Sequence, residues 1–180
     1  MEKRLALAEY GKHLWTRERA REIRSRLEDM LEELHAGDVM VIDAQGVEVF
    51  DYSFANELFG KTLLSLAAEH PGRFLVVENL TTYTRENLAK ALESLGLAII
   101  ERKGRKLHLL GKVHPADQET FDAIVRAKGP VTAGVLTEQL GVNLTAMNER
   151  LAKLARLALV RREKGASPAG REQYQYSVLG

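Results

Sequence analysis

The stretch TEQLGVNLTAMNERL, residues 137–151, decides how the last third of the chain folds. Gly141 lies where a helix must reverse sharply, and glycine tolerates the left-handed backbone that such a turn needs. Asn143 follows as a good N-cap for a second helix. Farther along, LVRREK at 159–164 and QYQYSV at 173–178 flank a loop of Gly, Ser and Pro. The sequence therefore predicts two helices joined by a glycine turn and followed by a β-hairpin.

The second of these helices has two different faces. Its apolar residues recur at helical spacing and are expected to pack on the preceding helices: Leu144, Met147, Leu151 and Leu154. The opposite face carries Thr145, Glu149, Ala152, Lys153 and Arg156, flanked by Asn148 and Arg150. Asparagine suits adenine edges, and lysine and arginine reach guanine or phosphate, whereas Glu149 accepts from cytosine or repels phosphate. This face is therefore a candidate surface for reading duplex DNA.

Positive charge gathers at the same end of the chain. Residues 141–180 hold seven basic and three acidic side chains, although the whole chain has a net charge of only +1. A phosphate-contacting surface needs such a concentration because each contact releases condensed counterions. We expect four cations to lie on phosphates or in the minor groove: Arg161, Arg162, Lys164 and Arg171. For each of them taken singly, a solvated charged hairpin is the alternative.

This C-terminal part resembles the winged helix-turn-helix of bacterial regulators of the MarR and ArsR type. The matching pieces are LTEQLGV at 136–142, the spacing of Leu151 and Leu154, and LVRRE at 159–163, while Ala158 stands where such families usually have glycine. The resemblance implies DNA binding, and the exposed helix face and the hairpin supply the candidate contacts: Asn143, Thr145, Asn148, Glu149, Lys153, Arg156, Arg161, Arg162, Lys164 and Arg171. Because winged helices also serve as dimerisation or protein-docking modules, protein contact is the alternative.

The first two thirds of the chain alternate strand and helix patterns. Three apolar runs are too short for helices and predict strands buried on both faces: Val39–Ile42, Phe74–Val77 and Leu97–Ile100. Helices are predicted at 16–34, 54–68 and 84–95, and edge strands at 4–10 and 106–112. Thr84 is expected to cap its helix and Gly96 to end it. The fold class predicted is α/β, a mixed, largely parallel sheet with covering helices, plus the C-terminal winged helix-turn-helix.

Two domains are expected, residues 1–113 and residues 114–180. We interpret the segment 114–119 as a linker, because Pro115 lacks an N–H and disfavours continuing either a helix or a strand. Beyond the linker the pattern predicts a helix, a break and a second helix, at 120–128, 129–130 and 132–140.

The segment VMVIDAQGVEVFDYSFANELFG, residues 39–60, runs from a buried strand into a helix. It resembles the STAS domain of anti-sigma factor antagonists, and more closely an uncharacterised STAS-like family with a Ser-Phe-x-x-Glu-Leu motif. The matching positions are Asp43, Gly46-Val47, Asp51 and Ser53, and a fainter similarity extends over residues 4–112. The resemblance implies that Ser53 accepts a phosphate from a kinase of the GHKL ATPase type. Asp51, Asn56 and Glu57 are a candidate partner surface, and a solvated helix residue is the alternative interpretation of Glu57.

Ser53 directly before a predicted helix has a simpler interpretation as the N-cap of that helix. A phosphate at the same place would meet free N–H groups and the positive end of the helix dipole. It would still reverse a protein interface through its charge. The capping and switching interpretations both stay open at this point.

Catalysis has the least support. The chain lacks a phosphate-binding loop, a dinucleotide glycine fingerprint, a His-Glu-x-x-His motif and a nucleophile elbow. Strand-end carboxylates that converged would hold Mg²⁺ or act as acid and base; the candidates are Asp43, Asp51, Glu57 and Glu78. Such residues often cap neighbouring helices instead. We expect no enzyme, no cofactor and no metal site.

The chain has no cysteine, no apolar run near the roughly 20 residues that span a bilayer, and no signal peptide, so we expect a cytoplasmic protein. Our leading hypothesis is a DNA-binding transcriptional regulator with a STAS-like partner or signal domain. A homodimer is expected, because one small head rarely supplies enough affinity for duplex DNA. The alternative is a phosphorylation-controlled protein-interaction switch, whose partner is a GHKL-type kinase or a sigma-regulating protein.

Overall fold

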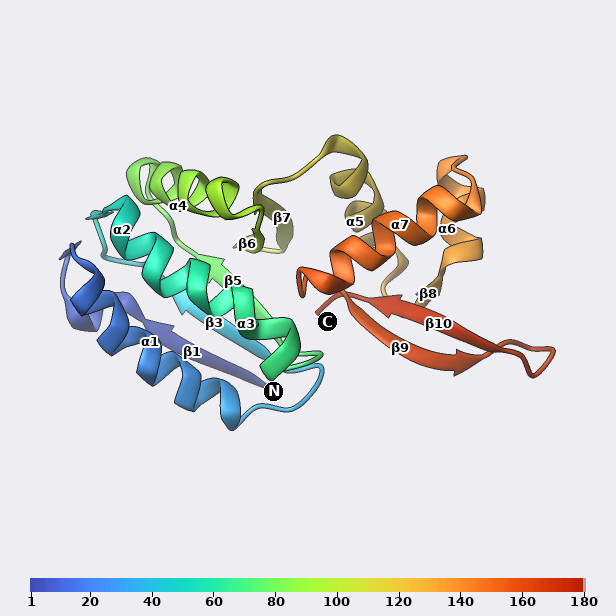
Figure 1. Ribbon diagram of the computed structural model, residues 1–180, viewed down its shortest axis with the longest axis horizontal. Coiled ribbons are helices and arrows are strands. Elements are labelled where there is room, and N and C mark those ends of the chain that lie inside the picture. Colours follow the sequence, from blue (N-terminus) through green and yellow to red (C-terminus); the bar gives the residue numbers. More distant parts are fainter. Residues whose placement is uncertain (180) are drawn as a thin grey trace.

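Five strands form the central sheet, in the order β1-β3-β5-β6-β7 (Figure 1). Their bounds are β1 Glu2–Ala6, β3 Val39–Asp43, β5 Phe74–Glu78, β6 Ala98–Lys103 and β7 Lys106–Gly111. The first four run parallel, and β7 pairs antiparallel with β6. The computed structural model describes residues 1–179, so Gly180, the last residue of the predicted second domain, lies outside the described residues. The fold is thus mixed α/β with a mostly parallel central sheet, as predicted.

Helices connect the parallel strands and cover one face of the sheet (Figure 1). They are α1 Arg17–Glu32, α2 Tyr52–Ala55, the π-helical turn η2 Asn56–Gly60, α3 Lys61–Glu69 and α4 Thr82–Leu95. The segments α2, η2 and α3 follow one another without a break, so the predicted helix at 54–68 is confirmed and begins two residues earlier. A short 3-10 helix, η1 Leu7–Tyr10, precedes a two-stranded parallel sheet of β2 His13–Leu14 and β4 Val49–Phe50.

The helix ends follow the capping rules, with one correction. Gly96 has a left-handed backbone, φ 69°, and ends α4 as predicted. The N-cap of α4 is Thr81 and not Thr84. Thr84 is the third helical residue, and its hydroxyl accepts the N–H of Thr81 in a reciprocal capping box. The sequence holds three threonines in a row of four, and the box uses the outer pair.

The C-terminal part, residues 115–179, is called the head from here on. It contains α5 Pro115–Ala127, β8 Val131–Thr132, α6 Ala133–Leu140, α7 Leu144–Arg156 and the hairpin of β9 Arg161–Ala166 with β10 Glu172–Ser177. The predicted succession of helix, glycine turn, helix and hairpin is therefore present. The predicted linker is wrong, because α5 begins at Pro115 with His114 as its N-cap. Proline at the first helical position needs no N–H partner and already has a helical φ.

The head packs on the face of the sheet that α1–α4 leave open. One continuous apolar core joins sheet residues such as Val41, Val76 and Ile100 to head residues such as Phe121 and Leu151. Figure 1 shows the head on the side of the molecule where β1 and β3 begin. The division into two domains at 113/114 stays a prediction, but apolar packing is shared across that boundary.

Candidate nucleic-acid interface

The start of α7 is built as its sequence predicts. Gly141 has φ 64° at the end of α6, and the Asn143 side chain accepts the Ala146 N–H at 2.9 Å. One face of α7 buries Met147, Leu151 and Leu154. Leu144 is different, because it is 53% exposed instead of packing inward as predicted. It is the first residue of the helix and lies before the buried stripe that starts at Met147.

The outer face of α7 keeps most of the predicted polar residues in solvent. The exposed ones are Thr145, Asn148, Glu149 and Arg156. Lys153 is an exception, because its ammonium forms a 2.5 Å ion pair with the buried carboxylate of Asp117 on α5. The pairing explains the correction, since a carboxylate as buried as Asp117 needs a compensating charge. Arg150 is paired too, with Glu119 of α5 at 3.5 Å, so among the exposed charged side chains of α7 Glu149 balances Arg156.

The hairpin adds three exposed cations to this part of the head. The Arg162 guanidinium stacks over the Tyr174 ring, 3.7 Å from its centre, and both side chains are exposed. Lys164 pairs with Glu172 at 3.1 Å, and these two side chains are largely exposed, so the pair is weak and easily exchanged. Arg171 is exposed in the loop between β9 and β10. These three cations form a positive edge, called the wing edge below.

Arg161 was predicted to contact DNA together with its neighbours, but its side chain does not lie on the wing edge. Its guanidinium pairs with Glu163 at 2.5 Å and lies over two glycines of the α/β part, 2.9 Å from where a Cβ on Gly37 would be. Gly72 is the second of these glycines. Successive residues of a strand point to opposite faces, so Arg161 turns toward the sheet while Arg162 turns toward solvent. Arg161 is thus a contact across the seam between head and sheet.

Sequence reasoning missed two partners of these cations. Tyr174 lies diagonally across the ladder from Arg162, whose direct neighbour is Tyr176. The alternation QYQYS was the available signal, because it places aromatic side chains two residues apart on one strand. Asp117 had no comparable signal, since it was assigned to the linker.

Ser53 does not cap its helix, which corrects the simpler of the two interpretations. The N-cap is Asp51, whose carboxylate accepts the Phe54 N–H at 2.7 Å. Ser53 is the second helical residue and is half-buried, and its hydroxyl makes no hydrogen bond within residues 1–179. Phe54 points into the core. The N-cap position of α2 is therefore occupied by Asp51, and the Ser53 hydroxyl has no capping role.

Glu57 is buried and is not a partner surface. It lies in the π-turn η2, facing α1, where its carboxylate meets Arg21 at 3.2 Å and Arg24 at 3.3 Å. Lys61 adds a third cation at 2.6 Å. Burial works to raise the pKa of Glu57, but hydrogen bonds from Lys61 and Arg21 hold it below its usual value. Of the other predicted partner residues, Asn56 is half-buried and Asp51 is the helix cap.

Of the four strand-end carboxylates, Asp43 and Glu78 lie together, whereas Asp51 caps α2 and Glu57 faces α1. Asp43 and Glu78 lie side by side on β3 and β5, with the Arg4 guanidinium 3.0 Å and 2.6 Å from them. Burial works to raise the pKa of Asp43, but Asn79, a backbone N–H and Arg4 lower it overall. Arg102 joins the same network through Glu78 and Glu2. Within residues 1–179, no three His, Asp or Glu side chains gather as metal ligands.

None of the helices in the described part of the chain has the length and apolar character needed to cross a membrane.

Comparison with known proteins gives little. No protein-family model matches the chain, and no curated protein does. Among solved structures, the chain is similar to a possible transcriptional regulator from Methanosarcina mazei Go1, with 14% sequence identity and a TM-score of 0.35. The similarity covers 38% of this chain and 57% of that protein.

Proposed function

We propose that this chain is a DNA-binding transcriptional regulator without enzymatic activity. The observation that supports it most is the arrangement of α7 and the wing edge in one head. An exposed polar helix face with Thr145 and Asn148 belongs to the same head as three exposed cations on a hairpin. Helix and hairpin of this kind suit a major groove and the phosphates that flank it.

The two parts have different tasks in this proposal. Asn148 and Thr145 contact base edges, and asparagine is suited to adenine. Arg162, Lys164 and Arg171 neutralise phosphates and fix the register of the head on the duplex. Glu149 discriminates against most sequences, because it is repelled by phosphate unless it accepts a hydrogen bond from cytosine.

The α/β part is proposed as a STAS-like module that senses a partner or signal. Its apolar packing against the head gives a physical route for coupling, since a change at the sheet alters the surface on which the head rests. A homodimer is part of the proposal, because two heads on one duplex double the number of phosphate contacts.

Salt-dependent binding to duplex DNA tests this function. A random-sequence duplex library is enriched on the full chain, and fluorescence anisotropy then measures binding of the enriched duplex at several salt concentrations. Arg156 and the three wing cations predict a log–log slope of roughly −3.6 per head, at about −0.9 per phosphate. The double variant Arg162→Glu with Lys164→Glu, which reverses two charges of the wing edge, should weaken DNA binding by about thirtyfold or more.

The matched control is Arg26→Glu with Lys90→Glu, which makes the same charge change at exposed positions of α1 and α4. The control should bind nearly as the parent does. Equal losses in both double variants would mean that only net charge matters, and no enrichment of any duplex would contradict the proposal.

A phosphorylation-controlled interaction switch is the second candidate. Its specific support is the Ser53 hydroxyl, which lies in the first turn of a helix that Asp51 already caps. A phosphate there is favoured by the helix dipole and would place negative charge beside exposed Tyr52. Incubation with a GHKL-type kinase and ATP should then phosphorylate the parent but not Ser53→Ala. Absence of phosphate from the peptide containing Ser53 would remove this candidate.

A further inference from the structure

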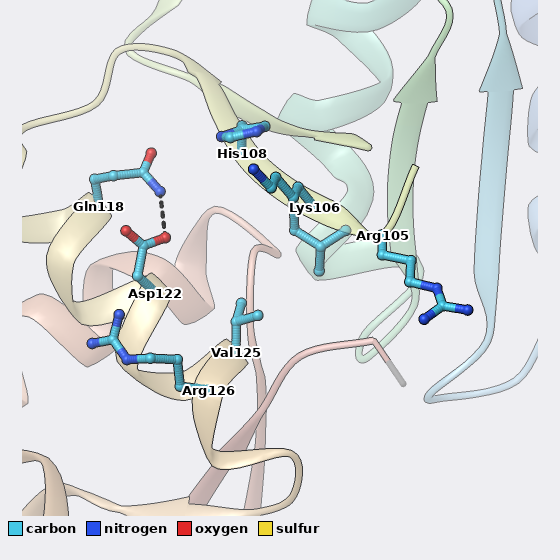
Figure 2. Close-up of a pocket in the computed structure, with 8 residues that line it drawn as sticks. Arg105, Lys106, His108, Gln118, Asp122, Val125 and Arg126 are labelled. Atoms are coloured by element: carbon cyan, nitrogen blue, oxygen red, sulfur yellow. Dashed lines mark hydrogen bonds between the residues drawn. The ribbon is translucent and has the colours of Figure 1, made fainter. Parts of the chain in front are cut away.

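A groove runs between the free edge of β7 and helix α5, away from α7 and the wing edge. It has a volume of about 630 Å³ and is lined on one side by Arg105, Lys106 and His108 and on the other by Gln118, Asp122 and Arg126 (Figure 2). Leu107 and Val125 supply apolar surface. A second hollow of about 370 Å³ shares Arg105, Leu107 and Val125 with it and adds Lys128. The groove thus lies where sheet and head meet.

The sheet edge along this groove still has backbone hydrogen-bonding groups to offer. β7 is the last strand of the sheet and, among residues 1–179, pairs only with β6. The Leu109 N–H points outward, since it donates to the Gln118 side chain at 3.4 Å. In an antiparallel ladder the outward groups alternate, so the N–H and C=O of Leu107 also point away from β6. Gln118 therefore covers one outward position of β7 and leaves the groove end open.

The charge around this edge is strongly positive. Arg105, Lys106, Arg126 and Lys128 are exposed, and none of them forms an ion pair with any residue between 1 and 179. The one carboxylate of the groove, Asp122, accepts a hydrogen bond from Gln118 at 2.9 Å. The groove and the hollow beside it thus combine four exposed cations with the apolar surface of Leu107 and Val125.

We propose that the groove binds an extended acidic segment of a partner protein, which adds to β7 as a further strand. Backbone pairing with Leu107 supplies affinity, apolar side chains of the segment rest on Leu107 and Val125, and its carboxylates meet the four cations. About four residues of β7 are available, which corresponds to about 14 Å of extended chain. A second copy of this chain is disfavoured as the occupant, because two β7 edges would bring Arg105 and Lys106 of each copy together.

This inference does not depend on DNA binding by the head. It uses neither α7 nor the wing edge, and Arg162→Glu with Lys164→Glu should leave it unchanged. Because α5 forms one wall of the groove and belongs to the head, an added strand would bridge sheet and head. The bound segment would therefore hold the two parts in a fixed relation.

The test uses the full chain and a fluorescein-labelled octapeptide of alternating glutamate and valine. A glutamate–valine octapeptide methylated at every backbone nitrogen has the same charge but has no N–H to donate to a strand edge. A peptide of alternating lysine and valine has the opposite charge. Anisotropy at low salt should show binding of the glutamate–valine peptide, with both other peptides weaker by about tenfold or more. Amide hydrogen exchange should slow at Leu107 when the first peptide binds.

Variants locate the site. Arg105→Glu with Arg126→Glu should lower the affinity for the glutamate–valine peptide by about tenfold or more, while Arg26→Glu with Lys90→Glu leaves it unchanged. Equal binding of the N-methylated peptide would overturn strand addition, and displacement of the peptide by duplex DNA would reassign the groove to nucleic acid. No peptide binding, together with self-association of the Arg105→Glu/Arg126→Glu variant, would show that the cations only protect the edge.

Discussion

The two faces of the central sheet are covered in different ways. One face packs against α1–α4, helices that alternate with the strands along the chain. The other face carries a similar apolar surface, including Val41, Val76 and Ile100, but it is covered by residues from the last third of the chain. When all the crossover helices of a sheet lie on one face, a different part of the chain must cover the second face. The head therefore serves two purposes, as a cover for the sheet and as the proposed DNA-binding surface.

The difference extends to charge. Near the beginnings of β3 and β5, the second face is apolar and meets the head, with Arg161 lying over Gly37 and Gly72. At the other end of these strands the same face carries the network of Arg4, Asp43 and Glu78. The head thus covers the apolar part of this face, which would otherwise be exposed to water, and leaves the charged part uncovered.

The largest expected effect comes from weakening the face that the head covers. Phe74→Ala removes a buried ring from the core shared by sheet and head and should cost about 3–4 kcal/mol of unfolding free energy. Urea denaturation, followed by circular dichroism, measures it. Because the core is continuous, the transition should stay single, and hydrogen exchange should accelerate in α7 as well as in β5.

Leu75→Ala on the opposite face of β5 is the matched control, since it loosens the packing of α1–α4 and also should give one transition. A separate early transition of the head in Phe74→Ala would show that the seam is only a loose contact.

On the helix-covered face, Glu57→Gln should cost about 2 kcal/mol, because it leaves three partly exposed cations around a neutral amide. The lowered pKa of Glu57 means that its contribution is present above about pH 5 and is lost as pH falls through the folded-state value. The parent should therefore lose more stability than Glu57→Gln between neutral and acidic pH. Parallel stability curves for the two proteins would contradict this.

A smaller effect separates the two neighbouring arginines of the hairpin. Arg161→Ala should cost about 1 kcal/mol of stability, since it removes a seam contact, and should change DNA affinity little. Arg162→Ala should do the reverse and weaken duplex binding with little effect on stability. Thermal denaturation measures the stability of both variants, and anisotropy measures their affinity for DNA. Identical behaviour of the two variants would contradict the different positions given to Arg161 and Arg162.

The smallest effect is expected at Ala158, which has φ 57° although it is not glycine. The left-handed conformation costs an alanine about 1 kcal/mol or more, and glycine avoids that cost but loses the Ala158 contact with the core. Ala158→Gly should therefore stabilise the chain by about 0.5 kcal/mol. The denaturant midpoints of the parent and the variant show whether the substitution stabilises or destabilises the chain.

Sequence reasoning found the strands and the turns because their signals are local. The apolar runs of β3, β5 and β6, Gly96, Gly141 and the cap Asn143 follow from residue type and spacing alone. What covers the second face of the sheet had no such signal, because an apolar run predicts burial but not its partner. The inward positions of Glu57 and Arg161 were missed for the same reason, since both depend on residues far away in the chain.

The candidate site was predictable in part. Thr145, Asn148 and Arg156 are exposed on α7, as the helical periodicity predicts, and so are three cations of the hairpin. Lys153 was not predictable, because its partner Asp117 lies on a helix whose start was assigned to a linker. Ser53 lost its capping role to Asp51, since both residue types cap well and only the backbone chooses between them.

Site-specific crosslinking tests the proposed DNA contact most directly. The chain has no cysteine, so Asn148→Cys gives a unique thiol on the exposed face of α7, and Ser25→Cys gives one on α1 as the matched control. Each carries a photoactivatable group and is irradiated with enriched duplex. The proposal predicts crosslinks to bases from position 148 and none from position 25, whereas crosslinks from position 25 without any from position 148 would contradict it.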